Sequence, residues 1–116
     1  MGEHEQINYV EFASRDIAAS KVFFSRVFAW TFEDYGPDYA AFSNQGLDGG
    51  FYRSEHCSTV EQGGALIVFY SRDIGATQAK VEQAGGVIVK QLFPFPGGRR
   101  FHFREPGGNE FAVWSE

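Results

Sequence analysis

The sequence predicts an α+β fold in which two βαβββ modules pair into a curved, cup-like mixed sheet with the helices outside. Residues 12–20 and 69–77 are identical at six of nine positions, which indicates an internal repeat at an offset of 57. In each half a strand-like run precedes a helix-like run, and three short strand-like runs follow. With 116 residues in total, neither half is large enough to bury a good core alone, so the halves are expected to pack together.

The first half begins with residues 7–13, a short run rich in β-branched and aromatic residues that predicts a strand. Asp16 can cap a helix with its carboxylate, and apolar residues recur at helical spacing over residues 17–28. Gly, Pro, Asp and Asn at 36–38 and 44–46 predict turns. These turns separate three short strands, expected near residues 30–35, 39–43 and 49–53.

The second half repeats this order. Residues 65–70 predict a strand, Asp73 caps a helix with a weaker apolar stripe over residues 74–84, and two glycines then end it. Three strands are expected near residues 87–93, 100–104 and 110–114. We therefore expect a single domain, residues 1–116, made of modules at about 5–55 and 64–116 that the polar segment 56–63 joins.

Composition narrows the function classes. A net charge of −5 and a pI near 5.1 disfavour nucleic acid as a partner. The longest apolar runs fall far below the roughly 18 residues of a membrane span, so no membrane partner is expected. The lone Cys57 and the polar N-terminal residues predict a cytoplasmic protein without disulfides. Aromatic residues make up 17% of the chain, and they must fill a core or line a cavity.

Three segments resemble the vicinal oxygen chelate superfamily, which includes glyoxalase I, bleomycin-resistance proteins and extradiol dioxygenases. Residues 7–12 leading to Asp16 are similar to its first strand and aspartate, and 23–30 to its Phe-Tyr-x-x-x-Phe-Gly-Trp helix ending. Residues 105–110 are similar to its Asp-Pro-x-Gly-Asn turn. Ala29 departs from the usual glycine at the helix end, where a left-handed backbone would cost an alanine about 1 kcal/mol.

Enzymes of this superfamily hold a divalent metal with His, Gln or Glu from the first and last strands of each half. Carried over to this chain, those positions fall on Tyr9, Leu66, Ala112 and Phe51. Three of them have no donor atom, and tyrosine is an unusual ligand for such cations. The resemblance therefore implies the fold, while these residues predict neither a metal nor another cofactor.

Alternation along the strands predicts which side chains line the cup. Phe42 and Phe103 match at an offset of 61, which predicts that Phe103 faces the helices and its polar neighbours face the cup. The residues expected to bind a ligand are Tyr9, Phe51, Leu66, Tyr70, Arg100, Arg104, Ala112 and Trp114. The segment 94–100 bears two glycines and two arginines, and it could act as a lid or anion clamp or be a plain hairpin turn.

Glu11 and His102 are the candidate catalytic groups, since a carboxylate and an imidazole can both transfer protons. Glu11 could instead pair with Arg100 or Arg104, and His102 could simply be hydrogen-bonded. Our leading hypothesis is a metal-independent protein of the glyoxalase/bleomycin-resistance type that binds a small aromatic or anionic organic molecule in the cup.

Two alternatives remain open from the sequence. One is a metal-independent lyase or isomerase that uses Glu11 or His102. The other is a lactoylglutathione lyase-like or dioxygenase-like enzyme that binds its metal through atypical ligands. The modules could pair within one chain or across a homodimer.

Overall fold

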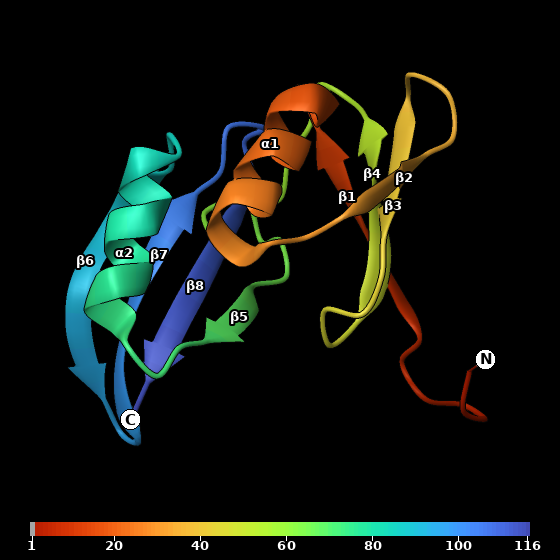
Figure 1. Ribbon diagram of the computed structural model, residues 1–116. Coiled ribbons are helices and arrows are strands. Elements are labelled where there is room, and N and C mark those ends of the chain that lie inside the picture. Colours follow the sequence, from red (N-terminus) through yellow and green to blue (C-terminus); the bar gives the residue numbers. More distant parts are fainter. Residues whose placement is uncertain (1) are drawn as a thin grey trace.

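The computed structural model describes residues 2–116 and contains two consecutive βαβββ modules (Figure 1). The N-terminal module comprises β1 (Tyr9–Ser14), α1 (Ile17–Phe28), β2 (Phe32–Asp34), β3 (Tyr39–Phe42) and β4 (Asp48–Arg53). The C-terminal module comprises β5 (Ile67–Tyr70), α2 (Ile74–Gln83), β6 (Val87–Phe95), β7 (Gly98–Arg104) and β8 (Glu110–Ser115). The predicted order of elements is confirmed, and no predicted end differs from the observed one by more than two residues.

Each module forms its own four-stranded mixed sheet. The strand orders are β1-β4-β3-β2 and β5-β8-β7-β6, so the two halves share one topology. In each sheet the first and last strands of the module pair in parallel, and the other pairs are antiparallel. Over residues 2–116, β1 and β5 form no ladder with each other, so the modules contribute two sheets rather than one continuous sheet. The segment 94–100 forms the end of the β6–β7 hairpin.

The two helices begin in the same way. Asp16 Oδ1 and Asp73 Oδ1 each accept a hydrogen bond from the amide three residues later, at 3.0 and 3.2 Å. A hydroxyl pair also recurs at the same place, Ser14 with Ser20 at 2.8 Å and Ser71 with Thr77 at 2.7 Å. The predicted caps are therefore confirmed, and the sequence repeat reflects a repeated local structure.

One apolar core serves both modules. Figure 1 shows α1 in the angle between the two sheets and α2 over the C-terminal sheet. Phe24 on α1 is 0% exposed, and its ring lies 5.5 Å from Phe51 in one sheet and 5.2 Å from Phe111 in the other. Because both sheets bury their helix-covered faces in this cluster, their opposite faces point away from it.

A buried carboxylate joins the modules within this arrangement. Glu105, after β7, accepts hydrogen bonds from the Ser20 hydroxyl of α1 and the Asn109 amide side chain, both at 2.8 Å. Asn109 Nδ2 also donates to the carbonyl of Ala13 on β1, at 2.7 Å. Burial raises the pKa of Glu105, although the amide of Gly107 and these donors oppose the shift.

The faces without helices are lined by alternate residues of each strand. The N-terminal open face consists of Tyr9, Glu11, Ala13, Glu33, Tyr39, Ala41, Asp48, Gly50 and Tyr52. The C-terminal open face consists of Val68, Tyr70, Val87, Lys90, Phe93, Phe95, Gly98, Arg100, His102, Arg104, Glu110, Ala112 and Trp114. Phe101 and Phe103 lie in the core, so the predicted orientation of β7 is confirmed. No helix within residues 2–116 is long and apolar enough to cross a membrane.

Candidate functional site

A chain of hydrogen bonds crosses the N-terminal open face. The Tyr39 hydroxyl donates to Glu11 Oε2 at 2.8 Å and lies 2.6 Å from the Tyr9 hydroxyl. Since the only hydroxyl proton of Tyr39 points to Glu11, Tyr9 must be the donor in the second bond. Burial and the hydrogen bonds to Tyr9 and Glu11 raise the pKa of Tyr39, so this phenol stays protonated at neutral pH.

Gly50 leaves space for the Tyr39 side chain in this hydrogen-bonded group. A Cβ atom at position 50 would overlap the Tyr39 ring and hydroxyl, so the phenol lies where a side chain of β4 would otherwise stand. Tyr39 is not among the residues that the sequence predicts for the site, although it lies on a predicted strand where its neighbours Ala40 and Phe42 are apolar. Side-chain alternation along this strand was the available signal, because both neighbours face the core.

A hollow of about 510 Å³ lies beside these hydrogen-bonded side chains, on the same open face. Tyr9, Glu33, Tyr35 and Asp48 line it, together with residues near the ends of β2 and β3. The negative charge of Glu33 raises the pKa of Tyr35. This hollow is therefore acidic and phenolic in character.

The C-terminal open face has a different polar group. Arg100 Nη2 and Nε lie 2.9 and 3.2 Å from His102 Nε2, and His102 Nδ1 lies 3.1 Å from Glu110 Oε2. His102 and Glu110 are only 4% and 6% exposed. Glu110 was absent from the predicted site, although it shares the face of Ala112 and Trp114 on β8.

Aromatic rings surround Arg100. Its guanidinium carbon lies 5.9 Å from the centroid of Phe93 and 5.7 Å from that of Phe95, both on β6. Trp114 lies opposite Arg100 in the β7–β8 ladder, and Tyr70 lies opposite Trp114 in the β5–β8 ladder. The Tyr70 and Trp114 ring centroids are 5.0 Å apart. A cation thus lies beside a partly exposed aromatic surface.

Phe51 corrects the predicted site. It is 0% exposed and stacks on Phe12 with centroids 5.5 Å apart, so it belongs to the core and lines neither open face. The offset of 61 that aligned Phe51 with Ala112 fails here. Glu11 pairs with Gly50 in the first sheet as Val68 pairs with Ala112 in the second, so the counterpart of Ala112 is Gly50.

The other predicted binding residues are spread along one face. Tyr70 and Trp114 lie on the C-terminal open face, where Ala112 is 0% exposed between Val68 and His102 on the neighbouring strands. Leu66 precedes β5 and is half-buried, and Arg104 is exposed at the end of β7. Glu11 bonds to Tyr39, and no ion pair between Glu11 and an arginine forms over residues 2–116.

The donor set does not fit the divalent metal of vicinal oxygen chelate enzymes. The four corresponding positions, with the corrected register, are Tyr9, Leu66, Ala112 and Gly50. None supplies an imidazole or a carboxylate. Across the part of the chain that the structure describes, no three His, Cys, Asp or Glu side chains come together in a way that could hold a metal ion.

Within residues 2–116, the predicted residues that line hollows are divided among separate ones. Tyr9 lines the acidic hollow described above, whereas Tyr70 lines an apolar cleft of about 310 Å³ between the sheets. Glu11 lines a third hollow of about 330 Å³ beside Cys57. Arg100, His102 and Trp114 line none of these three hollows.

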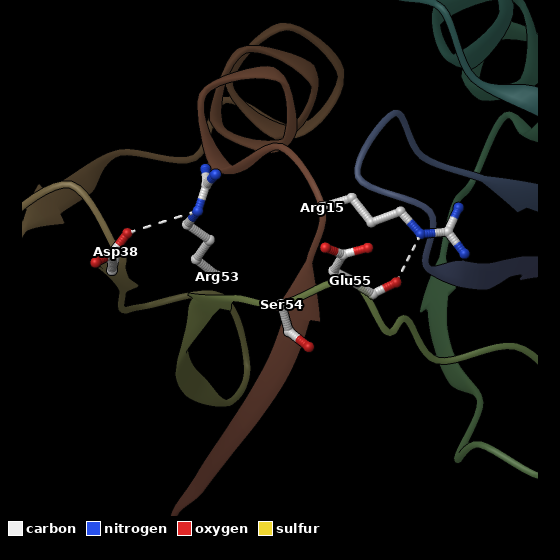
Figure 2. Close-up of a pocket in the computed structure, with 5 residues that line it drawn as sticks. All are labelled: Arg15, Asp38, Arg53, Ser54 and Glu55. Carbon is white, nitrogen blue, oxygen red and sulfur yellow. Dashed lines mark hydrogen bonds and ion pairs between the residues drawn. The ribbon is translucent and has the colours of Figure 1, made fainter.

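A further hollow of about 500 Å³ lies where β1 and β4 end, and Figure 2 shows the side chains around it. Arg15 Nε donates to the carbonyl of Glu55 at 3.0 Å, and Arg53 Nε lies 3.8 Å from Asp38 Oδ1. The two guanidinium groups point in different directions (Figure 2). Their charges are thus directed to separate neighbours, and none of the predicted site residues lines this hollow.

The chain is similar in sequence to one protein family and to two Streptomyces proteins. The model of the Glyoxalase/Bleomycin resistance protein/Dioxygenase superfamily matches residues 6–113. The anthracycline biosynthesis proteins DauV of Streptomyces sp. (strain C5) and DnrV of Streptomyces peucetius are each 28% identical to the chain over 124 residues. Each alignment covers 91% of this chain but 45% of the relative, so the chain spans less than half the length of these proteins.

Solved structures with low sequence identity share the fold. The fosfomycin resistance protein FosX from Listeria monocytogenes superposes with a TM-score of 0.79 at 14% identity, covering 98% of this chain and 95% of that one. A glyoxalase-related enzyme from Fulvimarina pelagi gives 0.78 at 16% identity, with 97% and 88% covered. TioX from Micromonospora sp. ML1 gives 0.70 at 21% identity, with 95% and 98% covered.

Proposed function

The chain belongs to the Glyoxalase/Bleomycin resistance protein/Dioxygenase superfamily, and from this premise we propose that it is a metal-independent binding protein for a small aromatic or anionic organic molecule. The observation that carries the proposal is the composition of the C-terminal open face. Partly exposed aromatic rings and a cation lie there, beside positions at which metal enzymes of the superfamily hold their ligands. Apolar surface with a few fixed polar groups is typical of sites for small organic ligands.

The binding cup requires a second copy of the chain in this proposal. Because the two open faces of one chain point away from the shared core, a cup lined by both module types forms when the N-terminal open face of one protomer meets the C-terminal open face of its partner. The N-terminal open face carries Glu11, Glu33 and Asp48, whereas the opposite one carries Lys90, Arg100 and Arg104. A two-fold dimer would pair these opposite charges twice.

Exposed apolar side chains support the same arrangement. Tyr9, Tyr52, Val68 and Tyr70 are each at least 40% exposed on the open faces. Clustered exposed apolar residues mark interaction or ligand sites more often than plain surface. We therefore expect self-association that weakens as salt screens the complementary charges. Sedimentation velocity at several protein and salt concentrations measures this, and a monomer under all conditions contradicts the dimeric cup.

Ligand binding is tested with the purified protein and a compound panel. The names of DauV and DnrV connect them to anthracycline biosynthesis, so an anthracycline is the first compound, followed by naphthoate and its neutral alcohol. Trp114 lies on the open face and Trp30 in the core, so a bound ligand should quench Trp114 and raise the melting temperature. The Trp114→Phe variant is the control for the quenching. No saturable response to any compound in either measurement overturns the proposal.

A second candidate function is metal-independent proton transfer by Glu11. The fixed hydrogen bond from Tyr39 leaves one oxygen of this exposed carboxylate free to accept a proton. Incubating a bound compound in D2O and following deuterium uptake by mass spectrometry tests this activity. Uptake that Glu11→Gln abolishes supports the enzyme, and equal uptake in both proteins rejects it. For the metal-dependent alternative, a stoichiometric metal in protein purified without chelators would overturn the metal-independent proposal.

A further inference from the structure

The hydrogen-bond polarity of Arg100, His102 and Glu110 can be assigned from their distances. A guanidinium has only donors, so His102 Nε2, at 2.9 Å from Arg100 Nη2, must accept and carries no proton. The proton of the neutral ring then lies on Nδ1, which donates to Glu110 Oε2 at 3.1 Å. Both ring nitrogens of His102 therefore have a hydrogen-bond partner. Because Nδ1 donates to Glu110 and Nε2 accepts from Arg100, only the Nδ1–H tautomer fits.

Glu110, at one end of this series of hydrogen bonds, is held by the backbone of the segment between the modules. Glu110 Oε1 accepts a hydrogen bond from the backbone amide of Val60 at 3.1 Å, so both carboxylate oxygens have partners. The Glu110 amide also donates to the carbonyl of Ser58 at 2.8 Å. The segment between the modules therefore covers this end of the C-terminal open face and holds the His102–Glu110 pair away from solvent.

Arg100 itself is fixed on one edge and free on the other. Its Nε–Nη2 edge points to His102, and its flat guanidinium lies near the rings of Phe93 and Phe95. No other hydrogen bond from this side chain forms within residues 2–116. The Nη1–Nη2 edge is left, and two parallel N–H groups on such an edge match the two oxygens of a carboxylate.

We infer that Arg100 is a carboxylate subsite, that His102 and Glu110 position it, and that the ligand is an aromatic acid whose ring lies against Trp114 and Tyr70. This inference rests on the proposed function, because it concerns the same open face. It assigns His102 a positioning role rather than proton transfer. It also adds Phe93, Phe95 and Glu110 to the residues that build the site.

The test uses 2-naphthoate and 2-naphthalenemethanol, which share a ring system and differ in charge, with calorimetry on the full chain. We expect naphthoate to bind at least tenfold more tightly than the alcohol, because a bidentate charge-assisted pair supplies the difference. Arg100→Gln should bring naphthoate to the affinity of the alcohol and leave the alcohol unchanged. Arg99→Gln removes the same charge one residue away, outside the open face, and should change naphthoate affinity less than twofold.

The positioning role needs its own measurement. His102→Gln keeps a hydrogen-bond acceptor for Arg100, so it should retain more naphthoate affinity than His102→Phe, which we expect to lose at least threefold. Glu110→Gln should weaken naphthoate binding by a similar factor without affecting the alcohol. In ¹⁵N NMR spectra the wild type should show the Nδ1–H tautomer of His102 and a slowly exchanging Arg100 Nε–H. The Arg100 Nε–H signal should disappear in His102→Phe, because that proton then exchanges rapidly with water.

The outcomes separate this inference from the proposed function. If both compounds bind with equal affinity, the carboxylate subsite is wrong while ligand binding on the open face stands. If neither compound nor any other panel member binds, the proposed function itself fails. An equal loss in the Arg99 and Arg100 variants would mean that only general charge matters, and the subsite would be rejected. Unchanged naphthoate affinity in folded His102→Phe and Glu110→Gln variants would reject the positioning role.

Discussion

The helices α1 and α2 begin alike and then differ in what they contact. At the offset of the repeat, Phe23 and Phe24 on α1 correspond to Lys80 and Val81 on α2. The first helix lies between two sheets and buries five residues, whereas the second covers one sheet and buries three. The difference teaches that local capping signals persist in a repeat, while the residues farther along each helix follow their tertiary surroundings.

The open faces of the two modules differ in a similar way. Both have the same strand order and the same register in their parallel pair, yet one carries phenols and carboxylates and the other arginines and aromatic rings. One sheet topology thus presents opposite charge on the two faces, although the β6–β7 ladder has register shifts and the β2–β3 ladder is regular. The largest predicted effects concern the shared core, and the smaller ones concern local signals that the halves have in common.

Substituting the core of α1 should give the largest effect. Phe24→Ala removes a fully buried ring that contacts both sheets, so we expect a loss of about 3–5 kcal/mol in the free energy of unfolding. Its repeat counterpart Val81→Ala should cost only about 2 kcal/mol, because it removes two methyl groups whereas Phe24→Ala removes a whole phenyl ring. Urea unfolding measures both. Equal losses would contradict the unequal roles of the two helices.

Substituting the buried carboxylate of Glu105, between the modules, should give the second-largest loss of stability. Glu105→Gln places an amide group among hydrogen-bond donors, which we expect to cost about 2 kcal/mol. Since the pKa of Glu105 is higher in the folded state, the folded protein binds more protons than the unfolded chain between the two pKa values. The free energy of unfolding should therefore fall as the pH rises from the ordinary glutamate range through the raised value.

Urea unfolding over a pH series compares the wild type with Glu105→Gln. The variant should lack the part of the pH dependence that Glu105 contributes. A difference between the two proteins that stays constant at every pH would show that Glu105 titrates alike in both states.

The two helix caps should contribute equally. Asp16→Ala and Asp73→Ala each remove one capping hydrogen bond of similar length, so each should cost about 1 kcal/mol. Thermal and urea unfolding of the two variants checks this. A cost at one cap that is several times that at the other would mean that the repeated local structure is not energetically equivalent.

The smallest effect concerns how the helices end. Ala29 follows α1 with φ of 60°, so the left-handed backbone anticipated for this position is present. Ala29→Gly should relieve it and stabilise the protein by up to about 1 kcal/mol. Ala84 follows α2 with φ of −89°, so Ala84→Gly should destabilise it by about 0.5–1 kcal/mol. The same sign for both changes in melting temperature would contradict this explanation.

The parts of the molecule that the sequence predicted well depend on short-range signals. Both caps and the strand–helix order follow from neighbouring residues, and the repeat offset of 61 oriented Phe103 correctly. The site depends on which strands pair and in which register, and a constant offset misplaced Phe51. Tyr39 hydrogen-bonds to Glu11, which is 28 residues away in the sequence, and Glu110 to His102, which is 8 residues away. Such contacts are set by the ladders, which single-sequence patterns do not specify.

Gly50 and Tyr39 together constrain how this chain could change over evolution. Gly50 occupies the fourth position at which metal enzymes of the superfamily carry a ligand, and the Tyr39 phenol fills the space of its missing side chain. A side chain introduced at position 50 would displace the Tyr39 phenol and disturb its hydrogen bonds to Tyr9 and Glu11. The effect of a substitution at position 50 therefore depends on the residue at position 39, so we expect the two positions to change together.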